Sequence, residues 1–155
     1  MDKRVIFAVA GSGKTTYIIN QLDSDIKAIV ITYTINNTKN LRQGIINKFG
    51  CIPPNIKLYS YFTFLYSFCF KPFLLDKLKP KGILWESPPQ WTNKVKRDKF
   101  IFYATKSRYL YHNRIARLLE ETDVLDKINH RIAKYYDYLF IDEIQDFAGH
   151  DFNLL

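Results

Sequence analysis

Cysteine is scarce in this chain of 155 residues, which contains only Cys51 and Cys69. The two form no CxxC pair, and neither makes a metal-binding pattern with His112, His130 or His150. These absences argue against a disulfide framework and against a zinc-binding module, and they fit a reducing compartment. Because Cys69 lies in an aromatic run, we expect it to be a buried free thiol.

Long apolar runs are also absent. The most apolar segment, residues 62–75, is interrupted by Lys71 and Pro72 and falls short of the ~20 residues that cross a bilayer. The N-terminus has basic residues before an apolar run, as a secretion signal does, but the run is shorter than the ~7–15 residues of such signals. We therefore expect a cytoplasmic protein with no membrane partner, large enough for one domain with its own core.

Positive charge is unevenly distributed along the chain. The net charge is +8, and residues 71–117 hold 12 Lys/Arg against 3 Asp/Glu, whereas the remainder holds 11 basic and 12 acidic residues. Such a concentration favours a polyanionic partner, with nucleic acid as the leading candidate. The alternative is a solvated basic surface that aids solubility.

Apolar runs and helical spacings alternate along most of the chain. Continuous β-branched runs predict buried parallel strands at residues 5–8, 28–33, 56–61 and 138–141. Helical spacing predicts helices at 15–22, 37–49 and 98–119, and Asp123 is a candidate cap for a further helix. This order predicts an α/β fold with a parallel sheet.

The middle of the chain has a different composition. Residues 71–93 hold four of the six prolines together with Trp85 and Trp91, which predicts an irregular segment. We therefore assign residues 1–70 and 121–155 to an α/β core and 71–120 to a basic, aromatic and mostly helical insertion. The two tryptophans are candidates both for packing anchors and for nucleic-acid contacts.

The stretch "AVAGSGKT", residues 8–15, fits a phosphate-binding (Walker A) loop. Gly11 and Gly13 allow the backbone to curl around a phosphate, Lys14 reaches the β and γ phosphates, and the Thr15 hydroxyl helps to hold Mg²⁺. The alternative is a glycine-rich turn between a strand and a helix. The predicted nucleotide-binding residues are Ala10, Gly11, Ser12, Gly13, Lys14, Thr15 and Thr16.

The stretch "YLFIDEIQD" places acidic residues at the end of a buried strand (Walker B). Asp142 stands at the carboxyl end, where open α/β sheets bind ligands, and is a candidate for holding Mg²⁺. Glu143 follows and can accept a proton from an attacking water, which favours hydrolysis over phosphate transfer. The alternative is a strand that runs into a polar turn.

Four motifs in family order resemble those of UvrD/Rep-type superfamily 1 DNA helicases. The "AGSGKT" at 10–15 is similar to motif I and "DEIQD" at 142–146 to motif II, while "VITYTINNTKNLRQGI" resembles motif Ia and "YSYFTF" resembles the motif after it. The resemblance implies a RecA-like P-loop NTPase domain that uses ATP and Mg²⁺, with the basic insertion at the place of subdomain 1B.

The resemblance also implies roles for individual residues. Lys14 would act on the phosphates, Glu143 would be the general base, and Gln145 would sense the γ-phosphate and couple it to DNA. The residues that would contact single-stranded DNA are Thr32, Tyr33, Thr34, Asn36, Ser60, Tyr61 and Thr63. For Tyr33 and Tyr61, plain core packing is the alternative.

The sequence also departs from the family pattern. Thr16 stands where these helicases often have an arginine, and Phe62 replaces the usual histidine. After motif II the family continues with motif III and a second RecA-like domain that carries an arginine finger. We therefore expect an incomplete sheet and a chain that is inactive alone. The alternatives for the missing half are a truncated gene product, an excised piece of a longer protein, or a split protein whose second helicase half is a separate chain.

Two other functions remain open at this stage. A non-catalytic regulatory module would bind nucleotide without DNA-stimulated turnover, even when the missing half is supplied. A small P-loop kinase would need arginines near its acceptor, such as Arg108, Arg114 or Arg117, but it would leave "DEIQD" unexplained. The favoured interpretation is the ATP-binding domain of an ATP-dependent DNA helicase or single-stranded DNA translocase.

Overall fold

A computed structural model describes residue 6 and residues 12–154 of the chain. The described residues fall into two compact units. The first unit comprises the residues up to Tyr61 together with Asn129–Phe147, and the second comprises Phe62–Ile128 together with the residues from Ala148 onward. The functional division drawn from the sequence, 1–70 and 121–155 against 71–120, stays a prediction.

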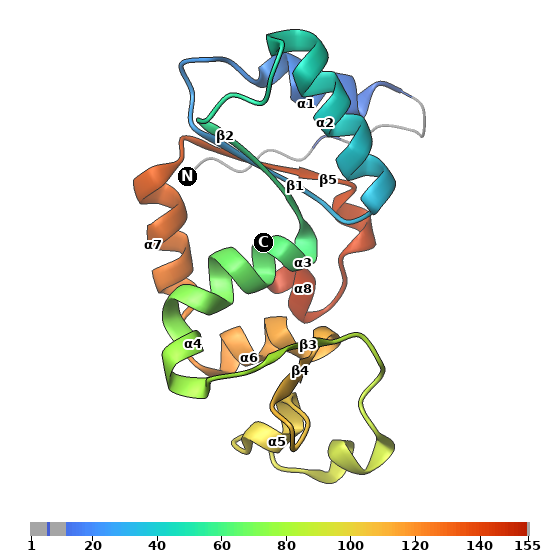
Figure 1. The fold of residues 1–155 in the computed structure, drawn as a ribbon, viewed down its shortest axis with the longest axis vertical. Helices are drawn as coiled ribbons and strands as arrows, with labels where there is room; N and C mark the ends of the chain where they lie inside the picture. The colour runs from blue at the N-terminus through green and yellow to red at the C-terminus, as the bar shows by residue number, and fades with distance from the viewer. Residues whose placement is uncertain (1–5, 7–11, 155) are drawn as a thin grey trace. The chain divides into compact units, whose positions relative to one another are not determined.

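The first unit is an α/β structure built on a parallel sheet (Figure 1). Among the described residues, its strands are β1 (Ala28–Thr32), β2 (Ile56–Ser60) and β5 (Tyr138–Asp142), in the order β2-β1-β5. Both pairs are parallel, which confirms the predicted sheet type. The strand predicted at residues 5–8 lies outside the described residues except for residue 6.

Two helices pack together on one face of this sheet (Figure 1). They are α1 (Lys14–Gln21) and α2 (Ile35–Phe49), and both agree with the predicted helices. Gly44 lies where the helices meet, since an added Cβ would collide with Ile19 Cδ1. The buried cluster that they form with the sheet consists of Ile18, Leu22, Ala28, Val30, Leu41, Ile45 and Ile56.

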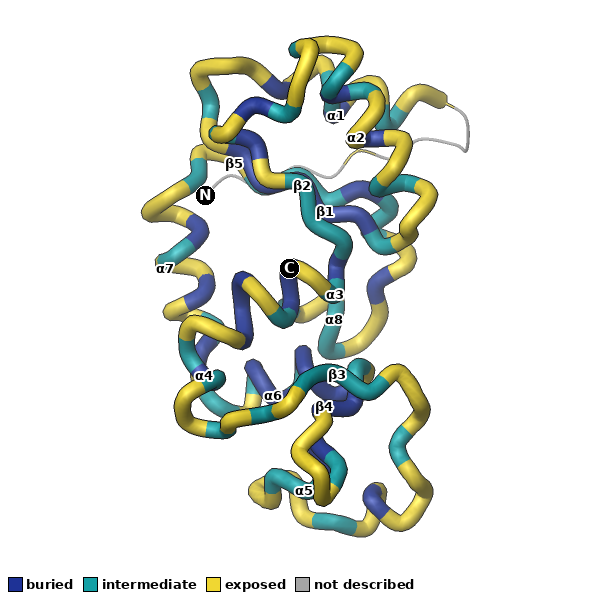
Figure 2. Tube along the Cα trace, in the orientation of Figure 1, coloured by how far each residue is buried: buried dark blue, intermediate teal, exposed yellow. Residues whose placement is uncertain are grey.

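Strand β1 is the centre of the first unit. All five of its residues are buried (Figure 2), as expected for a strand covered on both faces in a parallel sheet. Helix α7 (Leu125–Tyr135) spans the boundary between the units, and the chain returns from it into β5. Continuous apolar character therefore located the three described strands correctly, but only β1 is buried along its whole length, and most residues of β2 and β5 are partly exposed.

The second unit combines short helices with a two-stranded parallel sheet, β3 (Gly82–Leu84) and β4 (Tyr109–Tyr111). The division between the units falls within α3 (Tyr61–Thr63), and the second unit continues with a π-helical segment, Phe64–Phe70, which contains the buried free thiol of Cys69. The remaining helices are α4 (Lys71–Leu78), α5 (Phe100–Tyr103), α6 (Ile115–Glu121) and α8 (His150–Asn153), with short 3-10 turns at Gln90–Lys94 and His112–Arg114.

Two predictions for this region are wrong. The continuous helix expected at 98–119 is interrupted by β4, because Thr105 turns the chain by accepting hydrogen bonds from the backbone N–H groups of Arg108 and Tyr109. Arg108 has a positive φ of 69°, which no helix accommodates. The segment 71–93 is not irregular throughout: Lys71–Leu78 is helical, since Pro72 lies in the first turn, where its missing N–H has no helical partner to lose.

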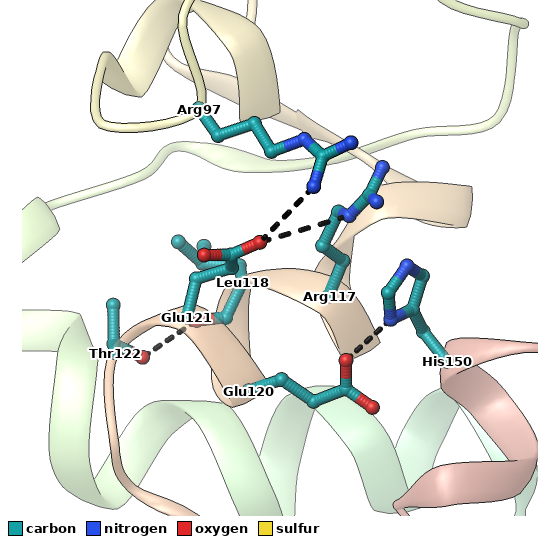
Figure 3. Close-up of polar contacts among 7 residues, drawn as sticks. All are labelled: Arg97, Arg117, Leu118, Glu120, Glu121, Thr122 and His150. Carbon is teal, nitrogen blue, oxygen red and sulfur yellow. Dashed lines mark hydrogen bonds and ion pairs between the residues drawn. The ribbon is translucent and has the colours of Figure 1, made fainter.

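Polar contacts join helices of the second unit (Figure 3). His150 of α8 contacts the Glu120 carboxylate of α6. Glu121 lies 3.9 Å from both Arg97 Nη1 and Arg117 Nε. Thr122 closes the end of α6 by donating a 2.6 Å hydrogen bond to the Leu118 carbonyl. The short helix α8 is therefore held against α6 by a specific side-chain pair.

Candidate nucleotide site at the sheet edge

The start of α1 has the geometry that a phosphate loop requires at its last glycine. Gly13 is the N-cap and has a φ of 83°, a left-handed conformation that favours glycine. Lys14 and Thr15 form the first turn and are half-buried, whereas Ser12 and Thr16 are exposed. Ala10 and Gly11, also predicted to bind nucleotide, lie outside the described residues.

Asp142 brings the two sequence motifs together. It is buried at the carboxyl end of β5, and this burial raises the pKa of its carboxyl group. Three neighbours oppose the shift: the backbone N–H of Glu143, the positive charge of Lys14 and the Thr15 hydroxyl, which donates a hydrogen bond to the carboxylate. The first turn of α1 therefore faces the end of β5.

The carboxyl ends of the three strands are level with one another. Thr32 of β1 pairs in register with Ser60 of β2 and with Asp142 of β5. Because side chains alternate along a strand, Thr32 shares the face of Ala28 and Val30, which α1 and α2 cover. Polar side chains from three strands thus collect beside the first turns of two helices.

Glu143 leaves the strand in a left-handed conformation, with a φ of 56°. Its carboxylate accepts a hydrogen bond from the side-chain amide of Asn37, in the first turn of α2. Thr34 caps this helix, since its hydroxyl accepts the backbone N–H of Asn37 at 3.2 Å. The first turn of a helix favours negative charge, so α2 stabilises the carboxylate of Glu143. Gln145, the predicted sensor, is exposed in the next turn.

Aromatic residues form a cluster near the same edge. The rings of Tyr33 and Tyr61 stack with centroids 5.9 Å apart, and Phe147 meets them edge-on at 5.2 and 4.8 Å. Tyr61 and Phe147 are buried, while Tyr33 is half-buried. In this arrangement Tyr61 packs in the core, and only Tyr33 presents part of a ring to solvent.

The other residues predicted to contact DNA have different surroundings. Thr34 and Asn36 are exposed at the start of α2, and Ser60 is half-buried at the end of β2. Thr32 is fully buried, and Thr63 belongs to the second unit. In that unit Trp85 and Trp91 are each more than half exposed, so neither is a fully buried anchor.

Two residues of this edge were not identified from the sequence. Asn37 stands three positions after the capping Thr34. A polar side chain at that position can form a hydrogen bond near the start of the helix, so this spacing could have identified Asn37 from the sequence. Phe147 follows motif II by one residue and carried no local signal. Its role depends on the rings of Tyr33 and Tyr61, which directly follow β1 and β2.

The oxygen groups of Thr15 and Asp142 suit Mg²⁺, a hard cation that prefers oxygen ligands and retains several waters. Within residues 12–154, no group of three or more His, Cys, Asp or Glu side chains is placed to hold a metal. A dedicated all-protein metal cage is therefore not seen in that range, whereas a Mg²⁺ shared with phosphates needs only one or two protein oxygens.

Comparisons with known proteins give no relative: no family model, no curated protein and no solved structure matches this chain. In the part of the chain that is described, no helix has both the length and the apolar character to span a membrane.

Proposed function

We propose that the first unit binds Mg-ATP at the carboxyl edge of its parallel sheet. The observation that carries this proposal is that Asp142 accepts a hydrogen bond from Thr15 and interacts electrostatically with Lys14, which unites a phosphate-loop sequence with an acidic strand end. Lys14 would neutralise the β and γ phosphates, and Thr15 and Asp142 would hold the metal. Bound Mg²⁺ supplies positive charge against the phosphate oxygens.

Hydrolysis is the chemistry that we propose for this site. Glu143 follows Asp142 directly, and Asn37 engages its Oε2, so the second carboxylate oxygen can take a proton from water. Gln145, exposed two residues later, is the proposed sensor of the γ-phosphate. These roles rest on the resemblance of "DEIQD" to motif II of superfamily 1 helicases.

We further propose that single-stranded DNA is the partner and that the chain provides the ATP-binding domain of a helicase or translocase with a RecA-like fold. The half-buried ring of Tyr33 and the exposed polar side chains of Thr34 and Asn36 support a nucleic-acid contact, since bases stack on aromatic rings and phosphates accept from amides and hydroxyls. The excess of 12 basic over 3 acidic residues at 71–117 supports a polyanionic partner.

Binding of a fluorescent ATP analogue tests the proposal. We expect Mg²⁺-dependent binding that Lys14→Ala weakens at least about tenfold, because a charge-assisted contact is lost. Lys57→Ala, at an exposed lysine of the same unit, is the matched control and should leave the affinity unchanged. Equal binding by wild type and Lys14→Ala would contradict the nucleotide site.

Phosphate release with and without a single-stranded oligonucleotide tests the second half of the proposal. DNA-stimulated release that Lys14→Ala abolishes would support an ATP-dependent motor domain. Nucleotide binding without DNA-stimulated release, even with the proposed second helicase half added, would favour a regulatory module. Transfer of phosphate to an acceptor other than water would favour a kinase.

A further inference from the structure

The hydroxyl of Thr32 is a buried polar group that has no hydrogen-bond partner among the described residues. Thr32 has an exposed fraction of 0%, and its Oγ1 makes no hydrogen bond within the described residues. A buried hydroxyl that is not hydrogen-bonded lowers the stability of the folded state, and native proteins rarely leave one unexplained. The Thr32 hydroxyl is therefore available to hydrogen-bond a ligand that reaches it.

The strand register gives the surroundings of this hydroxyl. Thr32 pairs with Asp142 on one side and with Ser60 on the other. Neighbouring strands lie about 4.8 Å apart, and paired residues of parallel strands present their side chains to the same face. Helices α1 and α2 cover that face, and the Asp142 carboxylate already accepts a hydrogen bond from Thr15 in the first turn of α1.

These observations separate Thr32 from the residues that follow it. Thr34 and Asn36 are exposed, whereas Thr32 is fully buried. A DNA strand on the surface would not reach its hydroxyl, although the helicase resemblance implies such a contact. Asp142 is buried as well and pairs with Thr32 in register, so a phosphate or a metal-bound water that reaches the Asp142 carboxylate would lie beside the Thr32 hydroxyl.

We propose that Thr32 is a nucleotide-site residue, whose hydroxyl hydrogen-bonds an oxygen of bound Mg-nucleotide (a phosphate oxygen or a metal-bound water), and that it is not a DNA contact. This inference rests on the proposed binding of Mg-ATP and adds a residue of strand β1 to that site. In the protein without nucleotide, the unpaired hydroxyl of Thr32 lowers the stability of the folded state.

The test compares Thr32→Val, which keeps the shape and removes the hydroxyl, with Thr32→Ser, which keeps the hydroxyl. We expect Thr32→Val to weaken Mg-nucleotide binding about tenfold, the effect of one hydrogen bond to a charged ligand. Thr32→Ser should bind within about threefold of wild type. Without nucleotide, Thr32→Val should melt at a higher temperature than wild type, and oligonucleotide affinity should not change.

Thr92→Val is the matched control. Thr92 is also fully buried, but its hydroxyl donates a 2.6 Å hydrogen bond to the Pro89 carbonyl. This variant should melt at a lower temperature than wild type and should bind nucleotide normally, because it loses a bond that the free protein makes. The opposite signs of the two melting shifts distinguish an unpaired hydroxyl from a paired one.

Three results would overturn the inference. If Thr32→Val leaves the nucleotide affinity unchanged, the inference about Thr32 is wrong, while the proposed function stands. If Thr32→Val weakens oligonucleotide binding and leaves nucleotide binding unchanged, Thr32 is a DNA contact and not a nucleotide-site residue. Absence of Mg-nucleotide binding by wild type, measured beside Lys14→Ala, would overturn the proposed function and this inference together.

Discussion

Asn37 donates a side-chain hydrogen bond to the carboxylate of Glu143, a residue 106 positions later in the chain. The bond joins the first turn of α2 to the segment that leaves β5, and both follow strand ends that are paired in register. The proposed general base is therefore held by the same turn that carries the proposed DNA contacts Thr34 and Asn36. Any ligand that moves this turn also moves the partner of Glu143.

Loss of the Asn37 amide should destabilise the first unit. We expect Asn37→Ala to lower the free energy of unfolding by about 1–2 kcal/mol, because a half-buried carboxylate loses its donor. Asn37→Asp should cost more, since it places a second negative charge against Glu143. Urea denaturation measures both. Asn36→Ala, at the exposed neighbour, should change stability by less than ~0.5 kcal/mol, and an equal loss there would contradict the assignment.

Asp142 should make stability depend on pH in the direction set by its raised pKa. When folding raises the pKa of a carboxyl group, the protonated carboxyl contributes its full stability at pH values below the ordinary pKa of 3.8. This contribution is lost as the pH rises through the raised pKa. Asp142→Asn removes the buried charge, so it should raise the melting temperature at pH 7. Its advantage should shrink as pH falls towards 3.8.

Thermal melts across this pH range provide the measurement for Asp142. Asp76→Asn, at an exposed carboxylate of the second unit, is the control and should have only a small effect at pH 7. Addition of Mg²⁺ and nucleotide should favour wild type over Asp142→Asn, because the variant lacks the charge that would hold the metal. A lower melting temperature for Asp142→Asn at pH 7 without ligand would contradict the pKa direction.

Phe147 should be the main apolar contact of the aromatic cluster. It has an exposed fraction of 5% and lies against both Tyr33 and Tyr61. We expect Phe147→Ala to cost about 3–5 kcal/mol in chemical denaturation, the range for a buried aromatic residue. Phe152→Ala, at a side chain with an exposed fraction of 53%, should cost far less. Similar losses for the two variants would mean that the cluster does not stabilise the fold.

Arg114 should stabilise the second unit in a way that lysine cannot reproduce. Its guanidinium lies 4.0 Å from the centre of the Phe102 ring, donates to the Phe102 carbonyl and donates a 2.7 Å bond to Asn93 Oδ1. Burial lowers the pKa of this group, and the hydrogen bonds and the ring contact compensate the buried guanidinium for lost water.

We expect Arg114→Lys to lose about 1–3 kcal/mol of unfolding free energy, because an ammonium cannot make both bonds and the ring contact. The measurement is denaturation followed by tryptophan fluorescence, since Trp85 and Trp91 both lie in this unit. Arg97→Lys, at an exposed side chain, should be nearly neutral. Full stability of Arg114→Lys would show that charge alone is needed at this position.

Local patterns in the sequence were sufficient for the elements of the first unit. Strands expected at 28–33, 56–61 and 138–141 end within one residue of β1, β2 and β5, and helices expected at 15–22 and 37–49 begin within two residues of α1 and α2. Apolar periodicity and continuous β-branched runs act over a few neighbouring residues, so they can be recognised without knowledge of the fold.

The second unit was predicted less well, because local patterns do not include partners that are distant in the sequence. The spacing at 98–119 suits a helix, but β4 forms there because it can pair with β3, and the guanidinium of Arg108 donates to the Lys79 carbonyl. These partners are distant in the sequence. Their contribution exceeds a local helical preference, which is weak for each residue.

The chain of amino acids thus determined the strands and helices of the first unit and the residue types of a phosphate loop and an acidic strand end. Tertiary structure alone decided that Thr32 is buried beside Asp142 with no hydrogen-bond partner in residues 12–154, that Asn37 holds Glu143, and that Phe147 covers Tyr61. Each of these relationships joins segments that are remote in sequence. Burial and hydrogen bonding between such segments depend on how the strands pair, and no local pattern carries that information.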